Sequence, residues 1–163
     1  MTVTLTFASA IQPDPGIVYS ILSQCYMGIL DTPFEERLRR FDRDVFENPD
    51  TVGVCTLISS LGGELVGLAS YDPRQAPRVG ILGHNGVLPS HRRKGYGTQQ
   101  ILEIVRLLAM RGCRRARVQT SEHPFFMPAC KMYEACGFRE SSRNRRSPED
   151  EYRVILYEML LTE

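Results

Sequence analysis

The segment from residue 83 to residue 97 brings together residue types that can hold a phosphate. Its sequence is GHNGVLPSHRRKGYG, and a helical pattern of apolar residues follows directly. Backbone N–H groups at a helix N-terminus carry partial positive charge, and glycines such as Gly95 and Gly97 let a phosphate approach the backbone closely. Arg92, Arg93 and Lys94 add fixed positive charge. The segment therefore predicts a local phosphate site; the alternative is a solvated basic turn with an ordinary glycine cap.

Two well-known phosphate-binding motifs are excluded by the sequence. The motif G-x-x-x-x-G-K-[ST] of nucleoside triphosphate sites does not occur. The dinucleotide motif G-x-G-x-x-G would need glycine at position 100, where Gln100 stands. Kinase and dinucleotide-binding interpretations therefore lose their main support.

The elements around this segment follow from hydrophobic periodicity. Alternation predicts a first strand over residues 2–7, helical spacing predicts a helix from residue 17, and Thr32 predicts the N-cap of a second helix. The Gly62-Gly63 pair predicts a hairpin between residues 52–60 and 65–71. Further along we predict, in order, a strand (79–87), a helix (97–111), a strand (116–120), a helix (128–136), a solvated loop (141–151) and a strand (152–160). This order predicts one mixed sheet with helices on its faces.

Composition limits the possible functions. The 163 residues suit one domain, and a formal net charge of +1 lacks the basic excess that is typical of nucleic-acid-binding proteins. No apolar stretch is long enough to span a membrane, so we expect no membrane partner. Five cysteines without a C-x-x-C pair favour neither a disulfide framework nor a metal site, and we expect a cytoplasmic protein without metal.

Two ordered motifs point to a known family. The first is R-x-x-G-x-G at Arg92, Gly95 and Gly97, and the second is A-x-x-x-Y-x-x-x-G-F, from Ala129 through Tyr133 to Gly137 and Phe138. Together they resemble the GNAT acetyltransferase superfamily. The resemblance implies an α/β (α+β) fold: a single GNAT-like domain over residues 1–163 with a mixed, mostly antiparallel central sheet flanked by helices on both faces. The motif matches lie within residues 83–138.

The resemblance also implies roles for individual residues. The pyrophosphate of acetyl-CoA would lie on the loop and the Val87 amide would polarise the thioester carbonyl, so the implied coenzyme-binding residues are Val87, Arg92, Arg93, Lys94, Gly95, Tyr96, Gly97 and Thr98. Tyr133 matches the general acid that protonates the leaving thiolate. His84 is the first candidate for the general base, and His123, Glu122 or an ordered water are the alternatives. Family members often carry asparagine where this chain has Phe126.

The activity expected from this resemblance is direct transfer of an acetyl group from acetyl-CoA to a primary amine. The acceptor would be a small molecule or a peptide, with residues 26–41 lining its site, and a homodimer is possible. No acyl-cysteine intermediate is expected, because lone cysteines are more often buried than reactive. The alternatives are a catalytically silent module that binds or senses acyl-CoA, and a nucleic-acid-binding protein, which the net charge argues against.

Overall fold

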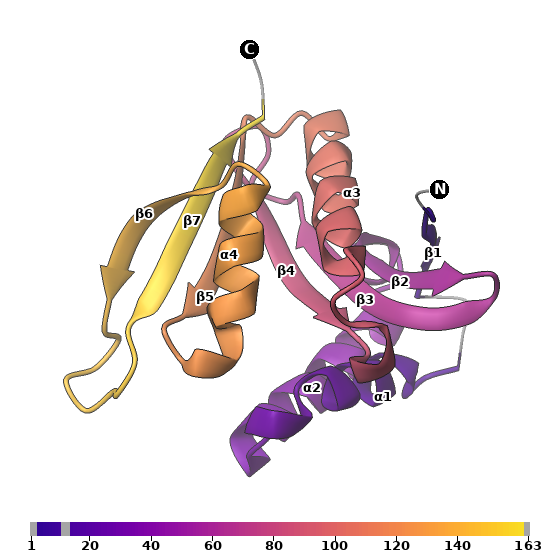
Figure 1. Ribbon diagram of the computed structural model, residues 1–163. Helices are drawn as coiled ribbons and strands as arrows, with labels where there is room; N and C mark the ends of the chain where they lie inside the picture. The colour runs from indigo at the N-terminus through magenta and orange to yellow at the C-terminus, as the bar shows by residue number, and fades with distance from the viewer. Residues whose placement is uncertain (1–2, 11–13, 162–163) are drawn as a thin grey trace. The chain divides into compact units, whose positions relative to one another are not determined.

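The computed structural model describes residues 3–10 and 14–161, and Figure 1 shows its ribbon. The described residues form seven strands and four α-helices: β1 (Thr6–Ser9), α1 (Ile17–Cys25), α2 (Thr32–Glu47), β2 (Thr56–Leu61), β3 (Glu64–Asp72), β4 (Gly80–Val87), α3 (Tyr96–Met110), β5 (Arg115–Ser121), α4 (Met127–Ala135), β6 (Arg139–Asn144) and β7 (Val154–Leu160). Short 3-10 helices also occur: η1 (Met27–Ile29), η2 (Gly53–Cys55), η3 (Pro89–His91) and η4 (Pro124–Phe126).

The strands form one hydrogen-bonded sheet in the order β1-β2-β3-β4-β5-β7-β6. The β1–β2, β2–β3, β5–β7 and β6–β7 pairs are antiparallel. Only β4 and β5 pair in parallel among these described pairs, with Gly80–Leu82 opposite Ala116–Val118. The expected fold class, α/β with a mixed and mostly antiparallel sheet, is confirmed.

The chain divides into two compact units that share β4 and α3. The first comprises Met1–Ser70 and His84–Gln100, and the second comprises Tyr71–Gly83 and Ile101–Glu163. The first unit therefore contains α1, α2, β1, β2, most of β3, the second half of β4 and the first turn of α3. The second unit contains the remaining elements.

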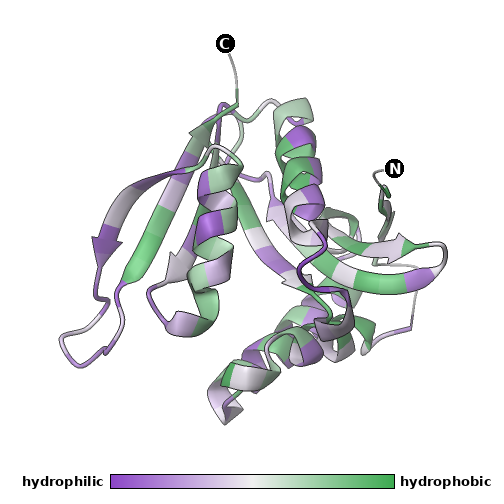
Figure 2. Cartoon of the chain, viewed as in Figure 1, coloured by the Kyte–Doolittle hydropathy of each residue, from purple (hydrophilic) through white to green (hydrophobic). Residues whose placement is uncertain are grey.

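In the first unit, α1 and α2 lie side by side and share an apolar core with β2 and β3 (Figure 1). Hydrophilic and hydrophobic residues alternate along α2 in Figure 2, as expected for a helix with one face on a core. Asp42 on α2 is 6% exposed, and its carboxylate accepts hydrogen bonds from the backbone N–H groups of Gly16 (3.0 Å) and Tyr19 (2.8 Å). One acid of α2 thus caps the start of α1.

In the second unit, α4 packs on the sheet through buried aromatic side chains. Tyr157 on β7 is 1% exposed and Phe138 is 2% exposed. The Tyr157 hydroxyl donates to Glu134 on α4 at 2.9 Å. This contact ties the helix that carries Tyr133 to the antiparallel strands β5 and β7.

Most predicted elements are present within a few residues of their predicted bounds, including both helices of the first unit and the Gly62-Gly63 hairpin. The first strand was predicted too early: its described part begins at Thr6, and residue 2 lies outside the described residues. Residues 53–55 form η2 instead of the start of a strand. The N-cap of α2 is Asp31, not Thr32, because the Asp31 carboxylate accepts the N–H of Phe34 at 2.8 Å.

The predicted solvated loop over residues 141–151 is wrong in its first part. Strand β6 extends to Asn144 and pairs with β7. Its sequence, RESSRN, has no apolar alternation because β6 is an edge strand with a largely exposed surface. Hydrophobic periodicity depends on which side chains are buried and not on which backbone groups are hydrogen-bonded. An edge strand whose side chains face solvent therefore shows little hydrophobic periodicity.

No helix among the described residues is long and apolar enough to cross a membrane.

Candidate functional site

The glycine-containing loop turns sharply before α3 and leaves backbone amides free. Arg93 has φ +62° and Gly95 has φ +82°, so both lie in the left-handed region. The first helical hydrogen bond runs from the Gln99 N–H to the Gly95 carbonyl, at 3.2 Å. The N–H groups of residues 95–98 therefore precede the first donor of the helix. A helix start of this kind attracts anions.

The space and charge around Gly95 suit a phosphate. A Cβ atom built at Gly95 would meet no other atom within 4 Å. Arg93 and Lys94 are exposed, and neither side chain forms an ion pair or hydrogen bond with another described residue. Figure 2 shows this segment as hydrophilic. Free amides, open space and unpaired cations thus coincide, and the loop suits an anion such as a phosphate.

Tyr96 contributes to this loop through its backbone only. Its side chain is 8% exposed and packs with Leu5 and Val66 in a small apolar cluster. The phenol ring anchors the first turn of α3 in the first unit. Its amide remains among the free N–H groups at the start of the helix.

Gln100 ties the same turn of α3 to β4. Its side chain is fully buried, accepts from the Ser59 hydroxyl at 2.6 Å, and donates to the Asn85 side chain at 2.7 Å and to the Gly86 carbonyl at 3.2 Å. The carbonyl of Leu68 lies at 3.4 Å from the same nitrogen. One buried amide thus joins β2, β3, β4 and α3 directly behind the loop. From the sequence, Gln100 only excludes a dinucleotide motif; the signal for its structural role is a polar residue beside the apolar face of a helix.

The end of β4 presents the amide of Val87 away from β3. The next residue, Leu88, donates its N–H to the Val66 carbonyl of β3 at 2.8 Å. Successive N–H groups of an extended chain point to opposite edges, so the Val87 N–H points to the other edge. An amide in this position can donate to a ligand that lies along the strand.

His84 is held in the first unit among aromatic rings. Its Nδ1 lies 3.2 Å from the Tyr26 hydroxyl, and its ring centroid lies 4.8 Å from that of Phe41. Burial lowers the pKa of His84 to about 4. The imidazole is therefore neutral at pH 7, and it is a weaker base than an exposed histidine.

Tyr133 is fixed on α4 by the residues of the second motif. After the helix, Gly137 has φ +100°, its N–H donates to the Glu134 carbonyl at 3.1 Å, and the Phe138 N–H donates to the Tyr133 carbonyl at 3.0 Å. The Phe138 ring centroid lies 5.8 Å from that of Tyr133. This is a Schellman helix end with its usual apolar contact. The glycine and phenylalanine of the motif thus position the tyrosine.

The hydroxyl of Tyr133 is protonated and available. The residue is 5% exposed, and burial raises its pKa well above the ordinary value of 10. Among the described residues its hydroxyl has no hydrogen-bond partner, yet no fully buried side-chain polar atom there lacks one. The hydroxyl therefore keeps contact with solvent. Tyr133 can donate a proton to a ligand and is unsuited to act as a base.

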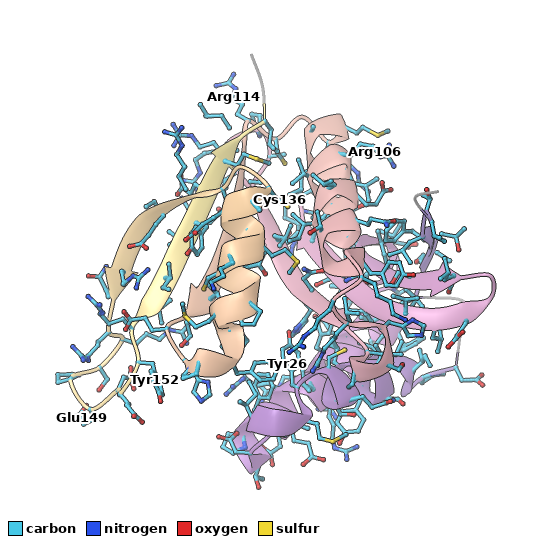
Figure 3. All side chains as sticks on the ribbon, in the orientation of Figure 1. Tyr26, Arg106, Arg114, Cys136, Glu149 and Tyr152 are labelled. Atoms are coloured by element: carbon cyan, nitrogen blue, oxygen red, sulfur yellow. The ribbon has the colours of Figure 1, made fainter. Side chains whose placement is uncertain are left out.

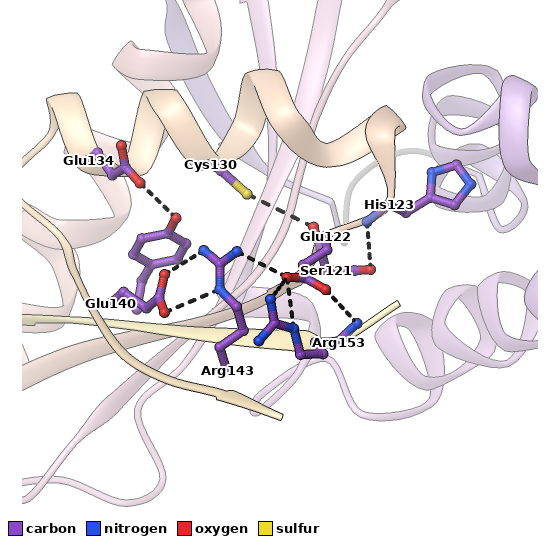
Figure 4. Close-up of polar contacts among 9 residues, drawn as sticks. Ser121, Glu122, His123, Cys130, Glu134, Glu140, Arg143 and Arg153 are labelled. Atoms are coloured by element: carbon purple, nitrogen blue, oxygen red, sulfur yellow. Dashed lines mark hydrogen bonds and ion pairs between the residues drawn. The ribbon is translucent and has the colours of Figure 1, made fainter. Parts of the chain in front are cut away.

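The other candidate bases are engaged in contacts of their own. The carboxylate of Glu122 accepts from Arg143 at 3.1 Å and from Arg153 at 2.9 Å (Figure 4). These contacts, with the Arg153 side chain foremost, lower the pKa of Glu122 to about 2. His123 accepts the Phe125 N–H on Nδ1 at 3.1 Å. Glu122 is consequently a poor proton acceptor, whereas His123 keeps its Nε2 free for another contact.

The cysteines show no sign of activation. All five are free thiols, and burial raises the pKa of the Cys25 thiol to about 11. Burial likewise raises the pKa of Cys130 on α4 and of Cys136 at the C-cap of that helix. Within the described residues no cluster of histidine, cysteine, aspartate or glutamate could hold a metal ion.

The implied coenzyme residues and His84 thus belong to the first unit, and Tyr133 belongs to the second. The structure thus contains a left-handed loop before a helix, a strand end with an outward amide, and a buried neutral tyrosine on a capped helix. The model of the acetyltransferase (GNAT) family matches residues 17–138. The chain belongs to this family, and it is an acyltransferase by membership.

Solved structures with a similar fold include acetyltransferases. A GNAT-family protein from Desulfovibrio desulfuricans is 17% identical and has a TM-score of 0.81, with 98% of this chain and 100% of that chain covered. The ribosomal-protein-S18-alanine N-acetyltransferase from Escherichia coli is 15% identical, with a TM-score of 0.74 and coverage of 98% and 96%. An aminoglycoside 6′-N-acetyltransferase complexed with coenzyme A is 15% identical, with a TM-score of 0.71 and coverage of 97% and 98%. No curated protein matches the chain.

Proposed function

We propose that this protein transfers the acetyl group of acetyl-CoA directly to a primary amine. The observation that carries the proposal is the loop before α3, where free amides, open space at Gly95 and the unpaired cations Arg93 and Lys94 coincide. Two similar structures support the choice of chemistry: one acts on the alanine of a ribosomal protein, and the other is an aminoglycoside acetyltransferase complexed with coenzyme A.

In this proposal the backbone of the loop holds the coenzyme. The amides of Gly95, Tyr96, Gly97 and Thr98 bind the pyrophosphate, and Arg92, Arg93 and Lys94 belong to the same cradle. The Val87 amide donates to the thioester carbonyl, so that charge developing on that oxygen is stabilised. These eight residues are the proposed coenzyme-binding set.

The proposed catalytic residues are Tyr133 and His84. Tyr133 donates its proton to the leaving thiolate, and its raised pKa keeps the phenol protonated until then. His84 accepts a proton from the attacking amine, directly or through water; its neutral imidazole is in the form that this role needs. The acceptor, a small-molecule or peptide amine, would lie near residues 26–41, and assembly as a homodimer is part of the same proposal.

Calorimetric titration of the purified protein with acetyl-CoA tests the proposal, with dephospho-CoA and ATP as comparison ligands. We expect saturable binding at micromolar concentrations with a preference for acetyl-CoA, followed by acetylation of at least one compound in a panel of amines. No binding by a folded sample would overturn the proposal. Tight binding without transfer to any amine, peptide or lysine side chain would favour the catalytically silent module instead.

A further inference from the structure

Arg92 uses its side chain differently from the two cations that follow it. Its guanidinium Nη2 donates to the Cys25 carbonyl at 2.6 Å, and its Nε donates to the Val87 carbonyl at 3.2 Å. The side chains of Arg93 and Lys94 form no hydrogen bond with another described residue. One of the three loop cations thus binds protein carbonyls, while the other two remain open to a ligand.

The first of these carbonyls lies at the end of α1. The last carbonyls of a helix have no partner within it, and a cation there is also favoured by the helix dipole. Cys25 is 3% exposed, and a Cβ atom built at Gly86 would come within 2.8 Å of its Sγ. The end of α1 is therefore packed directly on β4, and Arg92 joins the two backbones.

The residue after Cys25 is Tyr26, which is labelled in Figure 3. Its hydroxyl lies 3.2 Å from Nδ1 of His84 on β4, and its ring packs edge-on against Phe34 at a centroid distance of 5.1 Å. The place where α1 ends therefore determines whether this hydroxyl reaches the imidazole. A contact on Nδ1 in turn selects the ring tautomer and the state of Nε2.

We propose that Arg92 is a positioning residue, whose guanidinium holds the end of α1 on β4 and so keeps the Tyr26 hydroxyl on the His84 imidazole. The role belongs to the side chain; the backbone of Arg92 stays in the proposed cradle. The inference deepens the proposed function, on which it rests for the role of His84. It assigns to the first position of the R-x-x-G-x-G motif a link between the coenzyme loop and the helices proposed to line the acceptor site.

The substitution Arg92→Lys distinguishes the positioning role of Arg92 from simple electrostatic attraction of a phosphate. A lysine at position 92 keeps the positive charge, but its single ammonium group lacks the planar fork that reaches two carbonyls at once. If Arg92 served only as a charge, Arg92→Lys would preserve its function. If it positions α1, Arg92→Lys and Arg92→Gln have similar effects.

The test uses nitrogen NMR of the imidazole rings, because the chain has only three histidines. His84→Gln assigns the His84 signal, and Tyr26→Phe gives the spectrum without the hydroxyl contact. We expect both Arg92→Lys and Arg92→Gln to move the Nδ1 and Nε2 shifts of His84 toward those of Tyr26→Phe. Arg93→Gln, the matched control, should leave them in place. His84 shifts that stay at the wild-type values in Arg92→Gln, or that Arg92→Lys restores, would overturn the inference.

Calorimetry on the same variants separates the two roles of the loop. We expect Arg93→Gln to raise the Kd for acetyl-CoA by a larger factor than Arg92→Lys does. A larger rise in Arg92→Lys than in Arg93→Gln would contradict the positioning role. Failure of the wild-type protein to bind acetyl-CoA would refute the proposed function, whereas the His84 shifts would still decide whether Arg92 sets the Tyr26 contact.

A further NMR measurement tests the contact of Arg92 directly. In the wild-type protein we expect nuclear Overhauser contacts between the Arg92 guanidinium and the Cys25 α-proton. Their absence would also count against the positioning role of Arg92.

Discussion

Tyr133 and Tyr157 are both buried in the second unit, but their hydroxyl groups differ. The Tyr157 hydroxyl donates to Glu134 at 2.9 Å, whereas the Tyr133 hydroxyl has no partner among the described residues. Burial raises the pKa of both phenols. Only Tyr133 therefore has a proton that it can donate to a ligand without breaking an internal contact.

Replacing Tyr133 by phenylalanine tests this difference. We expect Tyr133→Phe to lower kcat by about a hundredfold or more, as is usual for loss of a general acid, with the Kd for acetyl-CoA within about threefold of wild type. Tyr157→Phe is the matched control and should retain most of kcat while losing some stability. Steady-state kinetics on an accepted amine and calorimetry give the two numbers. A kcat for Tyr133→Phe within threefold of wild type would assign the acid role elsewhere.

Gly95 allows a test of the phosphate site with strain held constant. Any side chain at φ +82° is strained, so Gly95→Glu is compared with Gly95→Gln, which has the same size. We expect Gly95→Glu to bind acetyl-CoA at least tenfold more weakly than Gly95→Gln, about 1.4 kcal/mol, because its charge faces the pyrophosphate. The difference should shrink at high salt. Equal affinities in folded variants would place the phosphates away from this loop.

At the scale of elements, two buried polar side chains fix how helices meet their neighbours. Gln100 joins the start of α3 to β4, and Asp42 of α2 caps α1. Neither contact follows from hydrophobic periodicity, because both are made between residues far apart in the chain. We therefore expect an apolar substitution at Gln100 or at Asp42 to lower the free energy of unfolding.

Gln100→Leu keeps the volume but leaves Ser59, Asn85 and the Gly86 carbonyl without their partner. We expect the free energy of unfolding to fall by about 2 to 4 kcal/mol, the range for orphaned buried polar groups, and acetyl-CoA affinity to fall as well. Gln99→Leu is the control, since Gln99 bonds to Val3 and Leu5 of the N-terminal segment. It should lose stability but keep coenzyme affinity. Urea unfolding and calorimetry measure both effects, and unchanged affinity in Gln100→Leu would separate the network from the loop.

Asp42→Ala removes both hydrogen bonds at the start of α1. The expected loss is about 2 kcal/mol, since a charged cap is replaced by an apolar group and two amides lose their acceptor. Arg43→Ala is the neighbouring exposed control and should change stability by less than about 0.5 kcal/mol. Urea unfolding of the two variants provides the comparison. Equal stability in both would mean that water caps α1 equally well.

For the whole molecule, His84 couples stability to pH. Its pKa is about 4 in the folded protein, below the unfolded value near 6.5, so the unfolded chain binds a proton that the folded chain does not. The contribution is fully present above pH 6.5 and is lost as the pH falls toward 4. We expect it to lower the free energy of unfolding by up to about 2 kcal/mol between pH 6.5 and pH 5.

Urea unfolding at pH 7, 6 and 5 measures this dependence, in a range above the carboxylate titrations. His84→Gln, which cannot titrate, is the control and should show a flatter pH profile. Parallel profiles for the two proteins would show that the His84 pKa is close to its ordinary value in the folded state. The aromatic surroundings of His84 would then have to be more hydrated than the structure shows.

Local sequence patterns were sufficient for most of the elements and for the family. The helices α1, α3 and α4 have apolar residues at helical spacing, and Gly62-Gly63 marks a tight turn, so both signals are contained in short windows of sequence. The motifs R-x-x-G-x-G and A-x-x-x-Y-x-x-x-G-F identify the loop and Tyr133 from the sequence alone, because the residues of each motif are close in the chain. Strand β6 was not predicted from the sequence because an exposed edge strand has no alternation of apolar residues.

Only the tertiary structure decided what each site residue contacts. It placed the guanidinium of Arg92 on the Cys25 carbonyl, 67 positions away in sequence, and the Tyr26 hydroxyl beside His84, 58 positions away. In the folded chain Glu122 accepts hydrogen bonds from two arginines, whereas the Tyr133 hydroxyl has no hydrogen-bond partner among the described residues. The sequence by itself determined the types of residue and the local turns, because these depend on neighbouring backbone. Hydrogen-bond partners, burial and the resulting pKa values depend on distant segments that meet only in the folded chain.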